Sequence, residues 1–228
     1  MSQEGLPEQF SGMVRLFPLP NVVLFPHAIQ PLHIFERRYI EMVEDALADD
    51  HLVALVLLKP GWEPHYWGKP AIYDVACIGR IRWHERLANG RFNLLLQGLC
   101  RFRIENEIAA ATLYRQAHGW PMPDLELNVD ETLKREILRQ VSARLPQEHP
   151  LSETLQTMHE LPMPLGVICD ILAFALPLEL RVKQHLLEAF DVAERAQALL
   201  RILCNLQKPE LLPMPHEARP FPPQFSAN

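Results

Sequence analysis

The chain has 228 residues, of which 48% are hydrophobic, and its 22 basic and 28 acidic residues give a net charge of −6. This length suits one large domain or two small ones. The acidic balance argues against nucleic-acid binding as the main activity, because phosphate neutralisation needs excess basic residues. No apolar run approaches the roughly 18 residues of a membrane span, and the first ten residues lack a secretory signal. We expect a cytoplasmic protein without a membrane segment.

Cysteine and histidine usage predicts neither a disulfide framework nor a metal site. The four cysteines lie far apart along the chain, at positions Cys77, Cys100, Cys169 and Cys204, as is usual for reduced thiols. Three His-Glu pairs begin like a zincin helix, but Ala88, Met163 and Pro220 stand where the second histidine is needed. We therefore expect no metal and no cofactor.

Residues 16–39 form short apolar segments separated by prolines. Because proline cannot donate a hydrogen bond to a neighbouring strand, prolines in a sheet occupy strand starts, edges or bulges. Those of this run predict short strands in a small, strongly bent barrel: Pro18, Pro20, Pro26 and Pro31. A helix should follow, because apolar residues then recur at steps of three and four: Phe35, Tyr39, Met42, Val43, Ala46 and Leu47.

The next hundred residues show strand patterns. Residues 52–58 are continuously apolar and end at Lys59-Pro60-Gly61, which predicts a fully buried, central strand. Further strands are predicted at residues 76–84, 92–97, 100–107 and 112–120. The Asn89-Gly90 pair favours a hairpin between the first two of these strands.

The period changes to helical after residues 121–124. Helices are predicted from Asp130 to Leu145, from Ser152, from Leu165 to Leu176, from Pro177, and from a capping Asp191 to Leu206. From Pro209 onward the chain is rich in proline and reads as an extended tail.

In this order and spacing, several of these segments resemble the N-terminal domain of Lon proteases. The resemblance is carried by residues 17–19, 21–26, 31–34 and 35–39, then by 79–108 and by 168–203. It covers roughly residues 13–206. The family fold then implies an α+β protein, with a PUA-like, mainly antiparallel β pseudo-barrel followed by a helical bundle. The corresponding boundaries are a flexible N-terminus at 1–12, a barrel subdomain at 13–121, a helical subdomain at 122–207 and a Pro-rich tail at 208–228.

The resemblance also implies a function. In that family this domain grips the substrates of a larger protease, or forms the whole of a stand-alone protein. The expectation is a non-catalytic module that binds unfolded or exposed protein segments, with the groove between barrel and bundle as the site. A protease or chaperone is a candidate further partner. The sequence shows neither the nucleotide-driven motor nor the Ser/Lys catalytic domain of full Lon proteases, so we expect no enzymatic activity.

An aromatic segment is the first candidate site. Trp62, Tyr66 and Trp67 lie within six positions and are flanked by prolines. They suit a platform for an extended peptide. The same residues would also serve as a plug for the barrel mouth, and both interpretations stay open.

Arginines on two predicted strands are the second candidate. Arg80 and Arg82 alternate with apolar residues on one strand, as Arg101 and Arg103 do on the next. Such alternation would point all four toward one basic face for nucleic acid or acidic peptides. The alternative is ordinary pairing with surface carboxylates. RNA binding through a PUA-like barrel is therefore the second functional hypothesis, and no convergent catalytic group supports a small-molecule enzyme.

Overall fold

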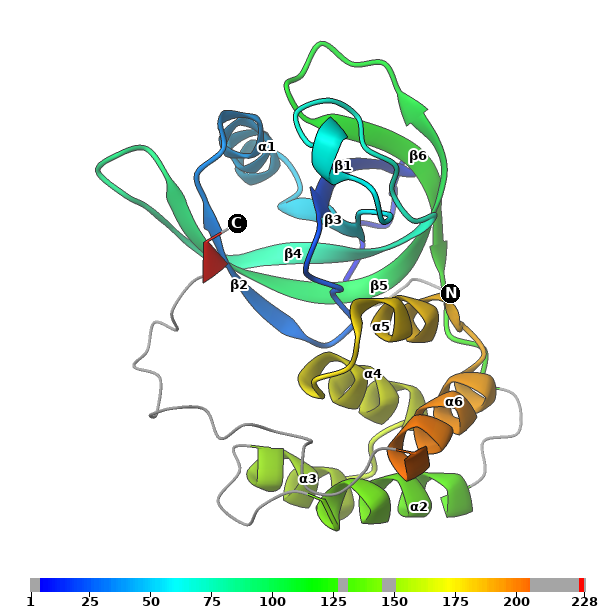
Figure 1. Cartoon of the computed structure of the whole chain (residues 1–228). Helices are drawn as coiled ribbons and strands as arrows, with labels where there is room; N and C mark the ends of the chain where they lie inside the picture. Colours follow the sequence, from blue (N-terminus) through cyan, green and yellow to red (C-terminus); the bar gives the residue numbers. More distant parts are fainter. Residues whose placement is uncertain (1–4, 127–130, 145–150, 206–225, 228) are drawn as a thin grey trace. The chain divides into compact units, whose positions relative to one another are not determined.

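A computed structural model describes residues 5–126, 131–144, 151–205 and 226–227 of the chain (Figure 1). The chain forms two compact units. One contains residues 1–123 together with 220–228, and the other contains residues 124–219. The first is a β-barrel with a helix and the second is helical, so the predicted α+β class with a PUA-like pseudo-barrel and a helical bundle is confirmed.

The barrel unit is built on one sheet with the strand order β4-β3-β1-β6-β5-β2-β7, and β4 also pairs with β5. That extra pairing closes β4, β3, β1, β6 and β5 into a ring. The strands are β1 (Met13–Leu19), β2 (Ile29–Ile34), β3 (Leu52–Leu57), β4 (Val75–Arg86), β5 (Phe92–Ile108), β6 (Arg115–Met122) and β7 (Ser226–Ala227). Among these strands β1 pairs with β3 in parallel, as β2 does with β7, and the other pairs are antiparallel.

The barrel core follows from strand alternation and from one helix. All six residues of β3 are buried, and β3 lies between β1 and β4, as its apolar run predicts. Helix α1 (Arg37–Ala48) buries Tyr39, Met42, Val43 and Ala46, which confirms the predicted apolar stripe. Phe35 does not belong to that stripe: it precedes the helix, and 38% of its surface is exposed.

The segment before β1 differs from the expected flexible lead-in. Leu6 and Phe10 pack against the core cluster of the barrel, and the Phe10 ring meets Phe102 edge to face at 6.2 Å. Burying these apolar side chains against the barrel interior stabilises the fold, because it removes apolar surface from water. Residues 5–12 are therefore part of the barrel unit.

The predicted hairpin is present, but its second strand is longer than predicted. Gly90 has a positive φ of 79° in the turn between β4 and β5, and the hairpin extends beyond the ring of strands (Figure 1). β5 then runs for 17 residues, where two strands separated at Gly98 were predicted. A register shift opposite Ile78 and Gly79 lets β5 bend without ending.

Gly98 lies where another part of the chain crosses β5 closely. Its N–H donates to the carbonyl of Ala28 at 2.8 Å, and its carbonyl accepts from the N–H of His27 at 2.9 Å. A Cβ at this position would lie 2.0 Å from the carbonyl oxygen of Phe25. Glycine is therefore required here, because the backbones of the two segments touch.

Phe25 anchors the same crossing and is fully buried at 0% exposure. Replacing Phe25 with Ala should lower the free energy of unfolding by about 3–5 kcal/mol, because the substitution leaves a cavity in addition to the lost apolar burial. Urea denaturation monitored by circular dichroism measures this. A loss below about 1 kcal/mol would show that the residue behaves as a surface position and would contradict the packing described here.

Gly98→Ala should destabilise the barrel by roughly 1–3 kcal/mol or more, because the added methyl group overlaps a backbone carbonyl and forces the two segments apart. Gly68→Ala is the matched control, since a Cβ there would make an ordinary contact, 3.4 Å from the carbonyl oxygen of His65. Thermal melting of both variants should show a large loss for Gly98→Ala alone. Equal melting temperatures would refute the close crossing.

The helical unit contains five described helices: α2 (Glu131–Ser142), α3 (Leu151–Glu160), α4 (Leu165–Ala175), α5 (Leu180–Glu188) and α6 (Val192–Asn205). Asp191 caps α6 as predicted, accepting from the N–H of Glu194 at 3.0 Å. Helix α5 does not begin at Pro177, because Glu179 still has an extended backbone with ψ 144°. The predicted helix ends at Asp130, Leu145 and Leu206 lie outside the described residues.

A buried ion cluster holds the start of this unit. Arg195 is fully buried, and its guanidinium pairs with Asp124 and lies 3.3 Å from a carboxylate oxygen of Asp170. It also donates to the carbonyl of Ala189 at 2.6 Å. The unit begins at Asp124, two residues after the predicted boundary. Residues 208–225 of the expected tail lie outside the described part of the chain, while Ser226–Ala227 form β7 of the barrel unit.

Candidate functional site: an aromatic loop beside a basic pocket

The segment of residues 59–70, which we call the aromatic loop, follows β3 in the barrel unit. It contains one turn of 3-10 helix, Glu63–His65. The rings of Trp62 and Tyr66 meet edge to face at 5.5 Å, and those of Tyr66 and Trp67 at 5.3 Å. The structure therefore brings together the three aromatic residues predicted from their spacing.

These three side chains differ in exposure. Trp67 is 84% exposed, the highest value among the described large hydrophobic residues, whereas Trp62 and Tyr66 are partly buried. A plug would bury both tryptophan rings. The geometry instead presents Trp67 to solvent, with Tyr66 packed against it as support.

The first turn of α1 and the residue before it hold the aromatic loop. The guanidinium of Arg38 lies over the rings of Tyr39, Tyr66 and Trp67, at 4.5, 4.9 and 5.9 Å from their centres. Its Nη1 also donates to the carbonyl of Tyr66 at 3.3 Å. The side chain of Arg38 thus joins the helix to the loop through both cation–π contacts and a hydrogen bond.

Glu36 completes this attachment. Its carboxylate accepts from Arg38 Nε at 3.0 Å and from the hydroxyl of Tyr66. Burial, together with this hydrogen bond to a carboxylate, raises the pKa of Tyr66. Burial opposes the charge of Arg38, but Tyr39 and Glu36 outweigh it and raise the arginine pKa. Near neutral pH Tyr66 is therefore a protonated donor and Arg38 is charged.

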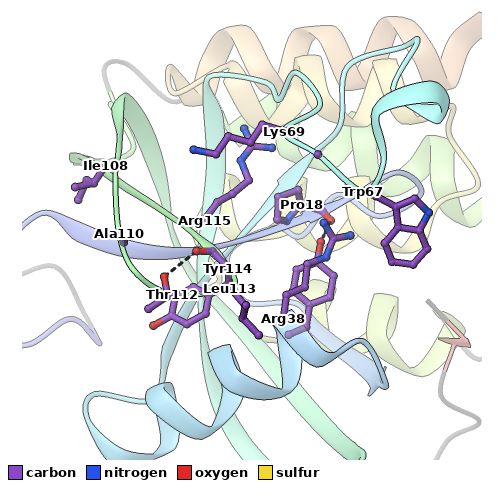
Figure 2. A pocket seen from close by; sticks show the side chains of 12 residues that line it. Pro18, Arg38, Trp67, Lys69, Ile108, Ala110, Thr112, Leu113, Tyr114 and Arg115 are labelled. Carbon is purple, nitrogen blue, oxygen red and sulfur yellow. Dashed lines mark hydrogen bonds between the residues drawn. The ribbon is translucent and has the colours of Figure 1, made fainter.

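A pocket of about 150 Å³ lies beside Trp67 (Figure 2). Trp67 borders it on one side, and the segment of residues 108–114 borders it on the other. Its lining consists of Pro18, Arg38, Tyr39, Trp67, Gly68, Lys69, Ile108, Ala110, Thr112, Leu113, Tyr114 and Arg115. The aromatic loop and the pocket therefore share Trp67.

Three cations line this pocket, and none of its described lining residues is acidic. Arg115 donates to both carboxylate oxygens of Glu107, at 2.8 and 2.5 Å, and to the carbonyl of Pro70 at 2.8 Å. This hydrogen bonding holds the pKa of Glu107 below its usual range. Arg38 is paired with Glu36. Lys69 makes no hydrogen bond or ion pair with any residue the structure describes.

The sequence did not indicate Arg38, Lys69 or Arg115 as site residues. Arg38 stands in the Glu36-Arg37-Arg38-Tyr39 helix entry that carries the family resemblance, and its position two residues after Glu36 was the available signal. Lys69 and Arg115 gave no local signal, since 45 residues separate them from each other in sequence. Folding alone places them together.

The four arginines of the second candidate site have separate environments. Arg101 is buried, with 2% exposure, and Arg103 is half-buried. Arg80 donates to the backbone carbonyls of Asp50 and Gly5, at 3.3 and 2.7 Å. Arg82 is exposed. Arg101 lies opposite Cys77, which is three residues before Arg80 on β4. Because successive residues of a strand point to opposite faces of the sheet, Arg80 and Arg101 face opposite ways, and no common solvent-facing patch forms from the four.

Within the described ranges, no three potential metal ligands from histidine, cysteine, aspartate and glutamate gather at one place. None of the helices in the described part of the chain is both long enough and apolar enough to cross a membrane.

The chain thus combines a PUA-like barrel unit, which carries an exposed aromatic loop, with a helical unit. Residues 13–205 match the family model described as the ATP-dependent protease La (LON) substrate-binding domain. The chain belongs to this family, and the resemblance found in its sequence is confirmed.

Curated relatives carry the same family name. The chain is 28% identical over 212 residues to a Lon protease of Heliobacterium modesticaldum, which covers 90% of this chain and 25% of that protein. It is also 28% identical over 194 residues to a Lon protease of Brevibacillus choshinensis, covering 83% of this chain and 24% of that protein. The chain thus spans about a quarter of the length of these relatives.

Solved structures share the fold. The N-terminal domain of a Mycobacterium avium complex Lon protease superposes with a TM-score of 0.67 at 18% identity, covering 86% of this chain and all of that one. A Lon N-terminal domain protein from Xanthomonas campestris gives a TM-score of 0.59 at 24% identity, covering 83% and 97%. At these identities the likeness concerns the fold alone.

Proposed function

We propose that this chain is a non-catalytic module that binds unfolded or exposed segments of other proteins through the aromatic loop. The observation that carries the proposal is the mounting of Trp67, which is 84% exposed yet packed against Tyr66 and Arg38. A large exposed aromatic side chain held in one place is the typical anchor of a recognition surface.

The fixed position of Trp67 matters because a mobile loop would have to be ordered on binding, which costs free energy. Contacts from Arg38 and Glu36 already fix the loop backbone at Tyr66. A bound segment would therefore order fewer protein groups and keep more of its contact energy as affinity. Unfolded segments expose the apolar side chains that such a ring can cover.

The wider role follows from the family. Its name describes substrate binding for an ATP-dependent protease, and the curated relatives are named Lon protease. We propose that the segments bound here are protein substrates in the cytoplasm, and that a protease or a chaperone receives them. The family match supports binding and carries no catalytic group with it.

Trp67→Ala should weaken binding to fluorescein-labelled casein, an unfolded protein, by about thirtyfold, because an aromatic anchor contributes about 2 kcal/mol. Its melting temperature should stay unchanged, since little of the ring is buried. Adding Trp62→Ala should weaken binding further, by some hundredfold in total, because the loop loses its second tryptophan. Fluorescence anisotropy measures the affinity and calorimetry the melting temperature.

Trp120→Ala is the matched control for this measurement. Trp120 is also an exposed tryptophan, at 44%, but it stands on β6 outside the loop and the pocket. It should leave casein affinity unchanged. A strongly lowered melting temperature with unchanged affinity in the Trp62/Trp67 variant would instead identify the loop as a plug. Binding to an oligoribonucleotide that weakens steeply with salt would favour the nucleic-acid hypothesis.

The purified chain should hydrolyse neither ATP nor casein, because the proposed role is binding alone. Phosphate release and casein fragmentation are measured on the wild-type chain and on the Trp62/Trp67 variant in parallel. Casein cleavage by the homogeneous chain would overturn the non-catalytic assignment, provided that an unrelated protein purified in the same way does not cleave casein.

A further inference from the structure

We propose that the basic pocket beside Trp67 receives a carboxylate of the bound polypeptide, either an acidic side chain or the carboxylate at the end of a chain. This inference rests on the proposed function and specifies which segments the module prefers. Residues from three separate parts of the barrel unit supply the positive charge: Arg38 from α1, Lys69 from the aromatic loop and Arg115 from β6 (Figure 2).

The size of the pocket restricts its ligand. Sites for small molecules and cofactors usually measure roughly 300–1,000 Å³, whereas this pocket measures about 150 Å³. A cavity of this size accommodates one side chain or one terminal residue. The pocket is therefore suited to a single group of a longer ligand.

The charges of the pocket are not balanced by its own lining. Glu36 and Glu107 lie behind the two arginines and neutralise them in part. Lys69 has only a longer-range attraction to Glu107. Lys69, which is exposed, is therefore the cation of the lining with no carboxylate in contact with it among the described residues.

The other acidic groups nearby have their own partners. On α1, Glu41 accepts from the backbone N–H of Leu113, and Asp45 accepts from the hydroxyl of Tyr114. These two bonds hold the 108–114 segment against the helix. Both carboxylates keep their charge, but they are turned to the backbone and hydroxyl donors of that segment and do not line the pocket.

Arg38 contributes charge to the pocket wall from a fixed position. Its Nη2 is buried and lies 2.9 Å from a carboxylate oxygen of Glu36, which holds the guanidinium in place. A ligand carboxylate in the pocket can accept charge-assisted hydrogen bonds from the cations that line it, and such bonds are stronger than neutral ones.

Trp67 sets the position of the carboxylate within a bound segment. Because its ring belongs to both the loop surface and the pocket lining, an apolar residue placed on the ring brings its neighbour to the pocket. The preferred segment is therefore an apolar residue next to a carboxylate. This differs from general attraction of acidic chains, which would not depend on position.

Three short fluorescein-labelled peptides test this preference by anisotropy. All contain Leu-Phe in an otherwise Gly/Ser sequence. The first has Glu directly after Leu-Phe and an amidated end, the second has Gln there and an amidated end, and the third ends with Gln as a free carboxylate. The wild-type chain should bind the first or the third about tenfold more tightly than the second at low salt, which corresponds to ~1.4 kcal/mol. A gain for the first assigns a side chain, and a gain for the third assigns a chain end.

Lys69→Glu should remove the tenfold preference, so that the carboxylate peptide and the amidated Gln peptide bind this variant equally. Lys69→Met should reduce the preference to about threefold, because both arginines remain. Lys59→Met is the matched control: this lysine belongs to the same loop but pairs with Asp74 and does not line the pocket. It should keep the full preference. Thermal melting verifies that each variant is folded.

The possible failures are distinguishable. If all three peptides bind equally and binding still depends on Trp67, the carboxylate pocket is refuted while the binding function stands. If neither the peptides nor casein binds, the proposed function itself fails, and this inference fails with it. A loss of preference in Lys59→Met as large as that in Lys69→Met would indicate general electrostatics. Displacement of the peptides by an oligouridylate in a Lys69-dependent manner would identify a phosphate site and also overturn the proposal.

Discussion

The parallel pairing of β1 with β3 is the constraint on which the candidate site depends. In an antiparallel pair, consecutive strand ends alternate between the two ends of a sheet, whereas parallel strands end on the same side. Leu19, the last residue of β1, lies opposite Leu57, the last residue of β3. The aromatic loop therefore leaves the barrel beside the end of β1, where Pro18 lines the pocket.

The elements next to β1 bring further residues of the candidate site to the same end of the barrel. β6 pairs with the other edge of β1 in antiparallel orientation, and Arg115, the first residue of β6, lies opposite Leu16. The crossover that makes the parallel pair possible runs through β2 and α1, and it brings Glu36 and Arg38 to the same end. Closure of the ring by the β4–β5 pairing fixes these strands relative to one another. One end of the barrel thus gathers segments from residues 18, 36–39, 58–70 and 108–115.

This topology also explains what the sequence could and could not predict. The apolar run of β3, the stripe of α1 and the clustering of Trp62, Tyr66 and Trp67 are local patterns, and each was found. The meeting of Arg38, Lys69 and Arg115 requires both the parallel pairing and the register of β6, neither of which has a local signature. Arg101 was misplaced for a similar reason, since alternation within each strand does not reveal which residue of β4 lies opposite Arg101. Helix α5 starts later than predicted because the backbone of Glu179 is still extended, and Pro177, two residues earlier, does not determine the conformation of Glu179.

The residues of the candidate site fall into two groups, those that hold the aromatic loop in place and those that are exposed to a ligand. Glu36, Arg38 and Tyr66 are wholly or partly buried and bonded to one another, so changes there would alter loop geometry and affinity together. Trp67 and Lys69 are exposed, so we expect changes there to affect the proposed binding while the barrel persists. An acidic protein of net charge −6 repels acidic chains at long range. The positive charge of Lys69 acts only over about one Debye length, roughly 8–10 Å at ordinary ionic strength. In the proposed mode of binding, the apolar contact with Trp67 therefore comes first, and it brings the carboxylate of the segment within this distance of Lys69.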